Sequence, residues 1–242
     1  MTQIEAILFD KDGTLFDFDA TWTVWAGTTI VGLADGDHGL AQQLANSIEY
    51  DLKNQQFLPG SSVIAGTMEE QAAALLPHLP GRTIDNLIAE LTERSLDVPQ
   101  VEVTPLITYF DDLRARRLRL GVATNDAELS MQRHLEIAGV SDFLDFAVGF
   151  DSGHGFKPMP GQLLAFAERV GVDPSRCAMV GDSTHDLEAA QAAGMVGIGV
   201  LTGPARREDL SGLASVVLPS IAEIPAWLDS LPSDAAAAPL GA

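Results

Sequence analysis

The feature that most constrains the fold of this chain is a regular alternation of short apolar runs with segments of helical spacing. Six apolar runs rich in β-branched and aromatic residues predict buried strands, at residues 4–9, 118–124, 146–150, 177–180, 196–201 and 215–218. Segments with helical spacing separate them, at residues 107–117, 127–138, 160–170 and 185–193. This alternation predicts an α/β fold in which a parallel sheet carries helices on both faces.

One long segment after the first strand breaks the alternation. It contains no apolar run typical of a strand, only helical candidates at residues 21–32, 39–52, 68–76 and 83–96. We therefore predict a core of residues 1–15 and 100–231 that carries an inserted, all-helical lobe of residues 16–99. The final residues, 232–242, are expected to be disordered because they are short of large apolar side chains.

Charge and composition exclude several classes of partner. The chain has 34 acidic and 14 basic residues and a formal net charge of -20, a field that repels nucleic acid and anionic membrane surfaces. No run reaches the roughly 18 apolar residues of a membrane helix, and the N-terminus lacks the basic region of a signal peptide. We expect a cytoplasmic protein. Its single cysteine, Cys177, lies in an apolar run and is expected to be a buried strand residue.

Polar side chains follow four of the predicted strands, directly at the strand end in three cases and at some distance in the case of Lys157. In an open parallel sheet, ligands bind beyond the carboxyl ends of the strands, so these positions are the candidate site. The candidates are Asp10, Asp12 and Thr14, then Thr124 and Asn125, then Lys157, and finally Asp182, Ser183 and Asp186. Four acids, one lysine and small polar donors are the groups that phosphoryl transfer with a divalent cation requires.

The spacing of the acids suggests a division of roles. Asp10 and Asp12 are two residues apart, so at an extended strand end their side chains can share one side. One carboxylate can then act as nucleophile while the other carries a proton for the leaving group. Asp182 and Asp186 can add oxygen ligands for Mg²⁺. The alternatives are an acidic turn for the first pair and helix capping for the second.

Lysine is scarce, with Lys11, Lys53 and Lys157 as the three examples in the chain. Lys157 lies in a loop stiffened by two prolines, which favours a role in holding phosphate and the Asp10 carboxylate over simple solvation. Thr124 can bond a phosphoryl oxygen while it also caps the following helix. The Lys11 side chain has two possible placements, across the end of the sheet or out to solvent.

With these residues assembled, the chain resembles the haloacid dehalogenase-like hydrolase superfamily. FDKDGT at residues 9–14 is similar to its first motif, Thr124 to its second, Lys157 to its third and GDSTHD at residues 181–186 to its fourth. The resemblance covers residues 1–15 and 100–225. It implies a Rossmann-like core and identifies the helical insert with the cap domain of phosphoglycolate phosphatase-like members.

The resemblance also implies a chemistry. It makes Asp10 the nucleophile and Asp12 the general acid/base. It assigns Mg²⁺ to Asp10, the Asp12 carbonyl, Asp182 and Asp186, and the substrate phosphate to Thr14, Thr124, Asn125 and Lys157. The expected activity is hydrolysis of a small phosphorylated metabolite through an aspartyl-phosphate, with phosphoglycolate as the leading substrate. Because members that dehalogenate lack the second acid, Asp12 argues against dehalogenation.

Two other functions remain open from the sequence. A sugar-phosphate mutase of the same superfamily also keeps the second aspartate, and a non-catalytic protein that binds phosphometabolites could use the same fold. Substrate selection is expected to come from the insert, where Lys53, Arg82 and Arg94 could bind an anionic tail or lie free on the surface. Trp22 and Trp25, near the first exit of the insert, could line the entrance to the site or belong to its core.

Overall fold

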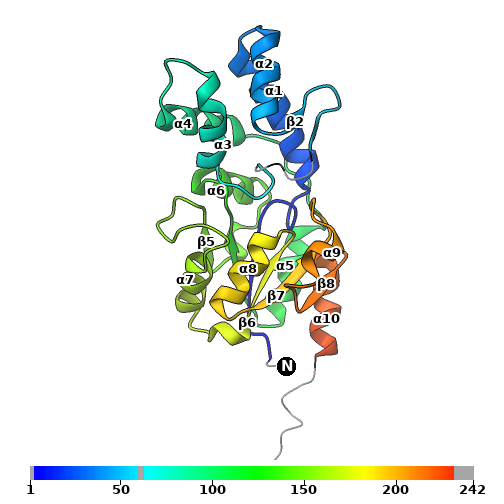
Figure 1. Ribbon diagram of the computed structural model, residues 1–242. Coiled ribbons are helices and arrows are strands. Elements are labelled where there is room, and N and C mark those ends of the chain that lie inside the picture. Colours follow the sequence, from blue (N-terminus) through cyan, green and yellow to red (C-terminus); the bar gives the residue numbers. More distant parts are fainter. Residues whose placement is uncertain (1–2, 59–60, 62, 232–242) are drawn as a thin grey trace, which may run out of the picture.

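Six parallel strands form the sheet that organises the core, in the spatial order β5-β4-β1-β6-β7-β8 (Figure 1). The computed structural model describes residues 3–58, 61 and 63–231. The predicted strands are all present, with ends that shift by at most two residues: β1 Ala6–Phe9, β4 Arg119–Ala123, β5 Phe146–Val148, β6 Cys177–Gly181, β7 Val196–Val200 and β8 Val216–Leu218. The α/β fold is confirmed. The predicted tail at residues 232–242 lies outside the described residues.

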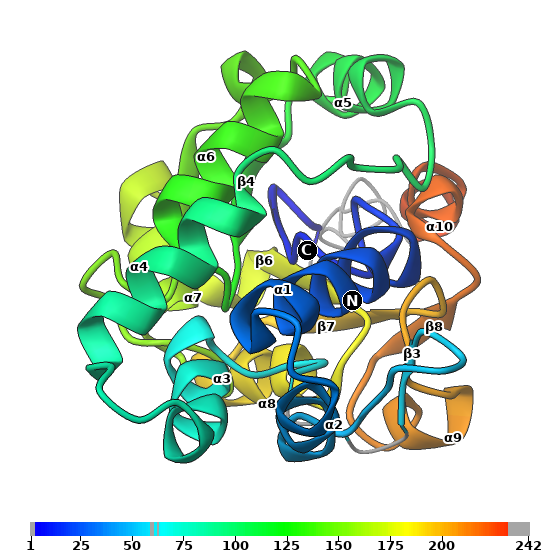
Figure 2. The same ribbon diagram turned by 90° about the horizontal axis from the view of Figure 1, so that it is seen from above.

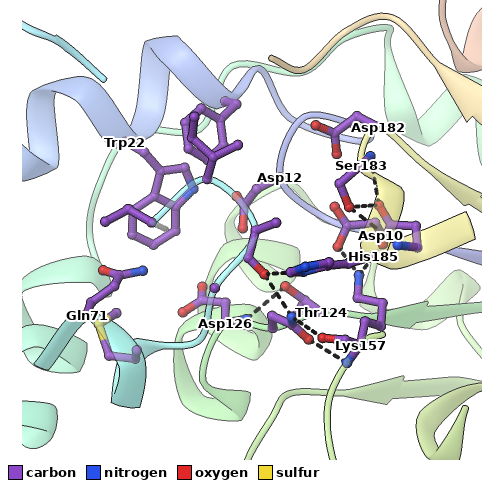
Figure 3. Close-up of a pocket in the computed structure, with 18 residues that line it drawn as sticks. Asp10, Asp12, Trp22, Gln71, Thr124, Asp126, Lys157, Asp182, Ser183 and His185 are labelled. Carbon is purple, nitrogen blue, oxygen red and sulfur yellow. Dashed lines mark hydrogen bonds and ion pairs between the residues drawn. The ribbon is translucent and has the colours of Figure 1, made fainter. Parts of the chain in front are cut away.

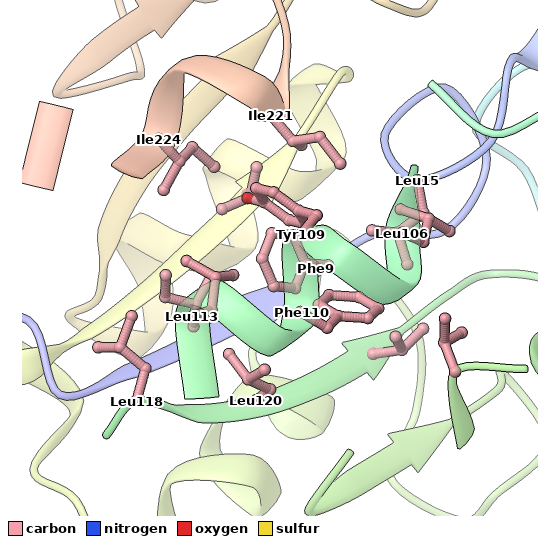
Figure 4. Close-up of a cluster of buried hydrophobic side chains, with 14 of the residues drawn as sticks. Phe9, Leu15, Leu106, Tyr109, Phe110, Leu113, Leu118, Leu120, Ile221 and Ile224 are labelled. Carbon is pink, nitrogen blue, oxygen red and sulfur yellow. The ribbon is translucent and has the colours of Figure 1, made fainter. Parts of the chain in front are cut away.

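Both faces of the sheet are buried, because successive side chains of each strand point in opposite directions. Ile7 and Phe9 of β1 belong to one hydrophobic cluster, whereas Ala6 and Leu8 belong to another. Figure 4 shows α5 packed on the first face, with the Phe110 ring centroid 5.7 Å from that of Phe9. This burial explains why the strands are continuous apolar runs rather than alternating ones.

Helices cover both faces, as predicted. α5 (Leu106–Ala115), α6 (Glu128–Ile137) and α10 (Ile224–Ser230) lie over the first cluster, and α7 (Gly161–Val170) and α8 (Thr184–Ala193) lie over the second. α7 and α8 stop at Gly171 and Gly194, whose φ values of 68° and 71° are left-handed and favour glycine. The short helices α9 (Arg207–Leu210) and α10 were not predicted.

The insert has its own hydrophobic cluster, which is distinct from those of the sheet. Its elements are a short π-helix at Asp19–Thr23, α1 (Val24–Ala34), α2 (His38–Ser47), β2 (Tyr50–Asp51), β3 (Gln56–Phe57), α3 (Met68–Leu75), a 3-10 helix at Leu76–His78 and α4 (Ile84–Ser95). Seen from above, α1 lies over the middle of the sheet and α4 runs beside α6 (Figure 2). The insert therefore stands over the carboxyl ends of the strands.

The prediction that the insert is entirely helical was wrong at one point. The helix expected over residues 39–52 ends at Ser47, and an antiparallel hairpin of β2 and β3 follows. Tyr50 explains this ending, because its ring packs against Phe57 with centroids 5.2 Å apart and its hydroxyl donates to the Thr23 carbonyl at 2.7 Å. These contacts place residue 50 next to the start of α1, a position that it could not occupy if α2 continued past Ser47.

Two adjacent chain segments connect the insert to the core. The Asp17 amide donates to the Val101 carbonyl at 2.8 Å, and the Val103 amide donates to the Leu15 carbonyl at 3.0 Å. Both crossings therefore lie side by side, a geometry suited to a hinge. Among the described residues, no helix combines the length and apolar composition that crossing a bilayer demands.

Candidate active site

A pocket lies where the carboxyl ends of β1, β4 and β6 meet the insert (Figure 3). The core side of its lining brings together most of the predicted site residues, from four separate segments: Asp10, Asp12, Thr124, Asn125, Lys157, Asp182 and Asp186. The insert closes the other side with Phe18, Trp22, residues 63–66, Met68 and Gln71. Parallel strands produce this convergence, because their carboxyl ends share one edge of the sheet.

Lys157 joins two of the carboxylates. Its Nζ lies 2.6 Å from Asp10 Oδ1 and 2.7 Å from Asp186 Oδ1, and the lysine is buried. Burial opposes the charged form of Lys157, but the two carboxylates outweigh that effect and raise its pKa above the ordinary lysine value. The ammonium group therefore remains positive in the pocket, and it fixes the orientation of Asp10.

Asp186 serves the site and the helix together. Its Oδ2 accepts hydrogen bonds from the backbone amide of Ser183 at 3.0 Å and from the Ser183 hydroxyl at 2.6 Å, while Oδ1 faces Lys157. Ser183, rather than Asp182, is the N-cap of α8. Helix capping therefore accounts for one oxygen of Asp186 only. Asp182 takes no part in the cap and lines the pocket.

Three buried carboxylates form a candidate metal site. Asp10, Asp182 and Asp186 each place an oxygen within 4.8 Å of the others. Desolvation, with repulsion from Asp186 and Asp12, raises the pKa of Asp10 to about 7 despite the nearby Lys157. Burial, then Asp10 and Asp186, raises the pKa of Asp182 well above its usual range. Oxygen ligands with this much mutual repulsion fit a hard divalent cation such as Mg²⁺.

Two glycines make room for Asp182. Gly13 has φ +79°, and a Cβ built on it would lie 2.5 Å from the Asp182 Cγ. A Cβ at Gly203 would overlap the same carboxylate. Because only glycine permits both the turn and the approach, the loops after β1 and β7 can close around Asp182.

Asn125 lies in the pocket as predicted, but its side-chain hydrogen bonds go to backbone groups. Its Nδ2 donates to the carbonyls of Ala65 and Lys157, both at 2.9 Å, and its Oδ1 accepts from the Lys157 amide at 2.9 Å. The side-chain amide is thus committed to backbone groups and orients Lys157 rather than contacting phosphate directly. Thr124 is closer to expectation, since its hydroxyl oxygen accepts from the Asp126 amide at 3.0 Å and leaves the hydroxyl hydrogen to donate into the pocket.

Thr14 does not reach the pocket, which contradicts its predicted contact with phosphate. It is fully buried and is absent from the described lining residues. The reason is the tight turn at Gly13, in which the amides of Leu15 and Phe16 donate to the Lys11 carbonyl at 2.9 and 3.1 Å. Thr14 is therefore a residue of this turn, behind the site.

The placement of Lys11, left open by the sequence, is across the end of the sheet. Its Nζ lies 2.8 Å from both Asp12 oxygens, 3.2 Å from Asp126 Oδ2 and 3.1 Å from His134 Nδ1, with no exposed surface. The Trp22 ring covers it, with the centroid 5.4 Å from Nζ. Lys11 thus anchors Asp12 in the same way that Lys157 anchors Asp10.

His134 completes this second cluster as a neutral partner. Desolvation and the neighbouring Lys11 lower the pKa of His134 to about 4. Its Nδ1 therefore accepts from Lys11, and its Nε2 donates to the Ser95 carbonyl at 2.8 Å. Asp126 carries a pKa raised to about 6, because burial outweighs the attraction of Lys11. Sequence reasoning missed both residues, although Asp126 directly follows the candidates on β4.

The basic residues proposed for an anionic substrate tail lie elsewhere. Arg82 and Arg94 both pair with Glu90 on the outer side of the insert, and Lys53 is exposed in the loop between β2 and β3. Trp22 lines the pocket, whereas Trp25 is buried behind it with the ring centroids 5.1 Å apart. His185 lies in the lining, with Nδ1 3.2 Å from the Ala65 carbonyl, so the core contacts the insert here too.

Comparisons with known proteins identify relatives in sequence and in fold. A sequence model of the haloacid dehalogenase-like hydrolases matches residues 4–194. Phosphoglycolate phosphatase from Xylella fastidiosa is 31% identical over 209 residues, covering 84% of this chain and 82% of that protein. Fructose-1-phosphate phosphatase YqaB from Escherichia coli is 29% identical over 200 residues, covering 80% and 95%.

Among solved structures, CbbY from Rhodobacter sphaeroides in complex with phosphate has a TM-score of 0.71 at 22% identity, covering 94% of this chain and all of that one. A HAD phosphatase from Thermococcus onnurineus has a TM-score of 0.66 at 19% identity. These likenesses agree in fold, and the sequence match extends from the first strand through α8. The chain belongs to the haloacid dehalogenase-like hydrolase family.

Proposed function

We propose that this protein is a Mg²⁺-dependent phosphatase that hydrolyses a small phosphomonoester through an aspartyl-phosphate on Asp10. The observation that carries the proposal is the pair of separate lysine anchors. Lys157 orients Asp10 beside Asp182 and Asp186, while Lys11 holds Asp12 at the same pocket. A protein that only binds phosphate has no need for two adjacent carboxylates that would repel it.

The proposed reaction divides the work between these two carboxylates. One oxygen of Asp10 attacks phosphorus in line, and Asp12 donates a proton to the departing alcohol oxygen. Asp12 then takes a proton from water, which attacks the same phosphorus and releases phosphate and Asp10. Lys157 and the Thr124 hydroxyl offset charge on the phosphoryl oxygens.

Asp10, Asp182 and Asp186 would hold the Mg²⁺ ion, which supplies further charge neutralisation at the transferring group. Residues 16–99 are proposed to act as a cap, since they close the pocket and would exclude bulk water from the first step. Opening at the paired segments around Asp17 and Val101 would admit substrate and release product.

The names of relatives support the reaction class and two kinds of substrate. One relative is a phosphoglycolate phosphatase and another a fructose-1-phosphate phosphatase, so both a carboxylated and a hydroxylated leaving group occur among similar proteins. Phosphoglycolate therefore stays a candidate substrate alongside sugar phosphates. In either case the product pair is inorganic phosphate and a small alcohol.

The test compares Asp10→Asn with Asp142→Asn, a control at an exposed aspartate of the core. With p-nitrophenyl phosphate and Mg²⁺, Asp10→Asn should lower kcat by about 10⁴-fold or more, as loss of a nucleophile does in other enzymes. Acid-quenched wild-type protein should carry a phosphoryl group detectable by intact mass, and Asp10→Asn should not. Phosphatase activity retained by Asp10→Asn would contradict the proposal, and phosphate found on a second substrate molecule rather than free would identify a mutase.

A further inference from the structure

The side of the pocket that faces the leaving group is formed by the insert and bears no charge. The insert residues in the lining are aromatic, aliphatic or amide, namely Phe18, Trp22, Val63, Ile64, Ala65, Gly66, Met68 and Gln71. Residues 59, 60 and 62, whose positions are not described, are proline, glycine and serine in the sequence and so add no basic side chain. Recognition by the insert therefore has to be uncharged.

The positive groups on the core side are already committed. The described lining contains five aspartates, one lysine, one histidine and no arginine. Lys157 lies between Asp10 and Asp186, and His185 directs Nδ1 to the Ala65 carbonyl. A substrate carboxylate beyond the phosphate would thus be buried near Asp12 and Asp126, which already share Lys11 as their cation, and this is strongly unfavourable.

Two polar atoms on the insert side are buried without a partner. Trp22 is 5% exposed and Gln71 is 6% exposed, yet the indole Nε1 and the amide Oε1 have no hydrogen-bond partner among the described residues. Figure 3 shows both side chains on the side of the pocket away from Lys157 and Asp182. Each unpaired buried group is destabilising unless a ligand satisfies it.

A hydroxyl can satisfy either a donor or an acceptor of this kind. A hydroxyl accepts from an N–H and donates to a carbonyl oxygen, whereas a carboxylate can do only the first. The Trp22 ring also offers an apolar face to the C–H groups of a carbon chain or sugar ring. A leaving group that carries several hydroxyls therefore matches this wall, and an acidic one does not.

We propose that the substrate is the phosphomonoester of a neutral, hydroxylated alcohol such as a sugar or sugar alcohol, and that Trp22 and Gln71 determine this specificity. This inference rests on the phosphatase activity proposed above. It selects the hydroxylated class over the carboxylated class represented by phosphoglycolate.

Matched substrate pairs test the proposal directly. Ethylene glycol monophosphate and phosphoglycolate differ only by a hydroxymethyl group in place of a carboxylate, as do glycerol 3-phosphate and 3-phosphoglycerate. In both pairs kcat/KM should be at least about 10-fold higher for the hydroxymethyl member, since a site with unpaired polar groups rejects an ill-matched analogue. Equal or higher kcat/KM for the carboxylates would overturn the proposal. p-Nitrophenyl phosphate distinguishes failure of the substrate-class proposal from failure of the phosphatase proposal. If the protein does not hydrolyse it, the phosphatase function itself is refuted.

Variants then test the two residues. Gln71→Leu should reduce the preference for the hydroxymethyl member about 10-fold, and Gln71→Arg should shift it toward the carboxylate. Gln43→Leu, at an exposed glutamine of α2, is the control. Trp22→Phe removes the N–H donor but keeps a smaller aromatic ring at the same position, and it provides a second test should Gln71 variants fail to fold. If kcat/KM falls equally for both members of a pair in folded Gln71→Leu and Trp22→Phe, these residues do not determine substrate preference and act only in the structure of the site.

Discussion

Replacement of Lys11 by methionine should destabilise the protein in a way that depends on pH. Lys11 is the cation that offsets Asp12 and Asp126, with Nζ 2.8 Å and 3.2 Å from their oxygens. Methionine preserves an unbranched side chain of similar length but leaves both carboxylates without that charge. Breaking a buried ion pair by removing one partner typically costs about 3–5 kcal/mol, because the remaining charge is buried and uncompensated.

The titration of Asp126 sets the pH range of this effect. Its pKa rises from 3.8 to about 6 on folding, mainly through burial, and Lys11 keeps it from rising further. Between these values the folded protein holds the proton, so wild type and Lys11→Met lose stability together as pH increases. Above pH 6, Asp126 of the wild-type protein ionises beside Lys11, and the wild-type protein stops losing stability as pH increases. In Lys11→Met the pKa of Asp126 is higher still, because the lysine charge is gone. The folding equilibrium constant of the variant therefore continues to fall about tenfold per pH unit.

The free energy of unfolding, measured by urea denaturation at pH 5.5 and pH 8, tests this reasoning. The difference between wild type and Lys11→Met should grow by about 3 kcal/mol over that interval, which is two to three tenfold steps. Lys53→Met, at the exposed lysine of the β2–β3 loop, should stay within about 0.5 kcal/mol of wild type at both pH values. Adding Asp126→Asn to Lys11→Met should remove most of the pH dependence. A difference that is the same at both pH values would show that Lys11 acts through packing rather than charge.

Two further predictions concern the metal and the cysteine. Saturating Mg²⁺ should raise the melting temperature by about 5–10 °C, the shift expected when a ligand at 100 times its Kd stabilises a chain of this size. Differential scanning fluorimetry with and without chelator measures this shift. Asp182→Asn should lose most of the shift if the acidic cluster binds the metal. The Cys177 thiol, whose pKa burial raises to about 12, should stay unreactive toward a disulfide reagent at pH 8 in the native protein and react fully in guanidinium; fast native labelling would contradict its burial.

Most of the core could be predicted because local signals and topology determine it. Each strand is a continuous apolar run with both faces buried, and the glycines after α7 and α8 end helices at residues that a pattern can identify. Once the strands are parallel, the residues that follow them must share an edge. The convergence of Asp10, Lys157 and Asp182 therefore follows from connectivity, and no side-chain detail is needed to foresee it.

The remaining features depend on contacts between distant segments that carry no periodic signal. Thr14 resembled a ligand because it follows the two aspartates, but the tight turn at Gly13 buries it outside the pocket lining. The hairpin in the insert depends on Tyr50 meeting Phe57 and the Thr23 carbonyl. The neutral insert wall combines two separate pieces of chain, residues 18–22 and 63–71, so its composition becomes visible only after folding.

The two buried lysines explain how a chain with a net charge of -20 can handle a phosphate. Each lysine lies between two aspartates: Lys157 contacts Asp10 and Asp186, and Lys11 contacts Asp12 and Asp126. The proposed nucleophile and the proposed acid/base are therefore held by different cations. A proton gained or lost by Asp12 changes the charge beside Lys11 directly, while Lys157 keeps its own contact with the Asp10 carboxylate. If one lysine served both, protonation of the leaving group would loosen the nucleophile during the step that needs it fixed.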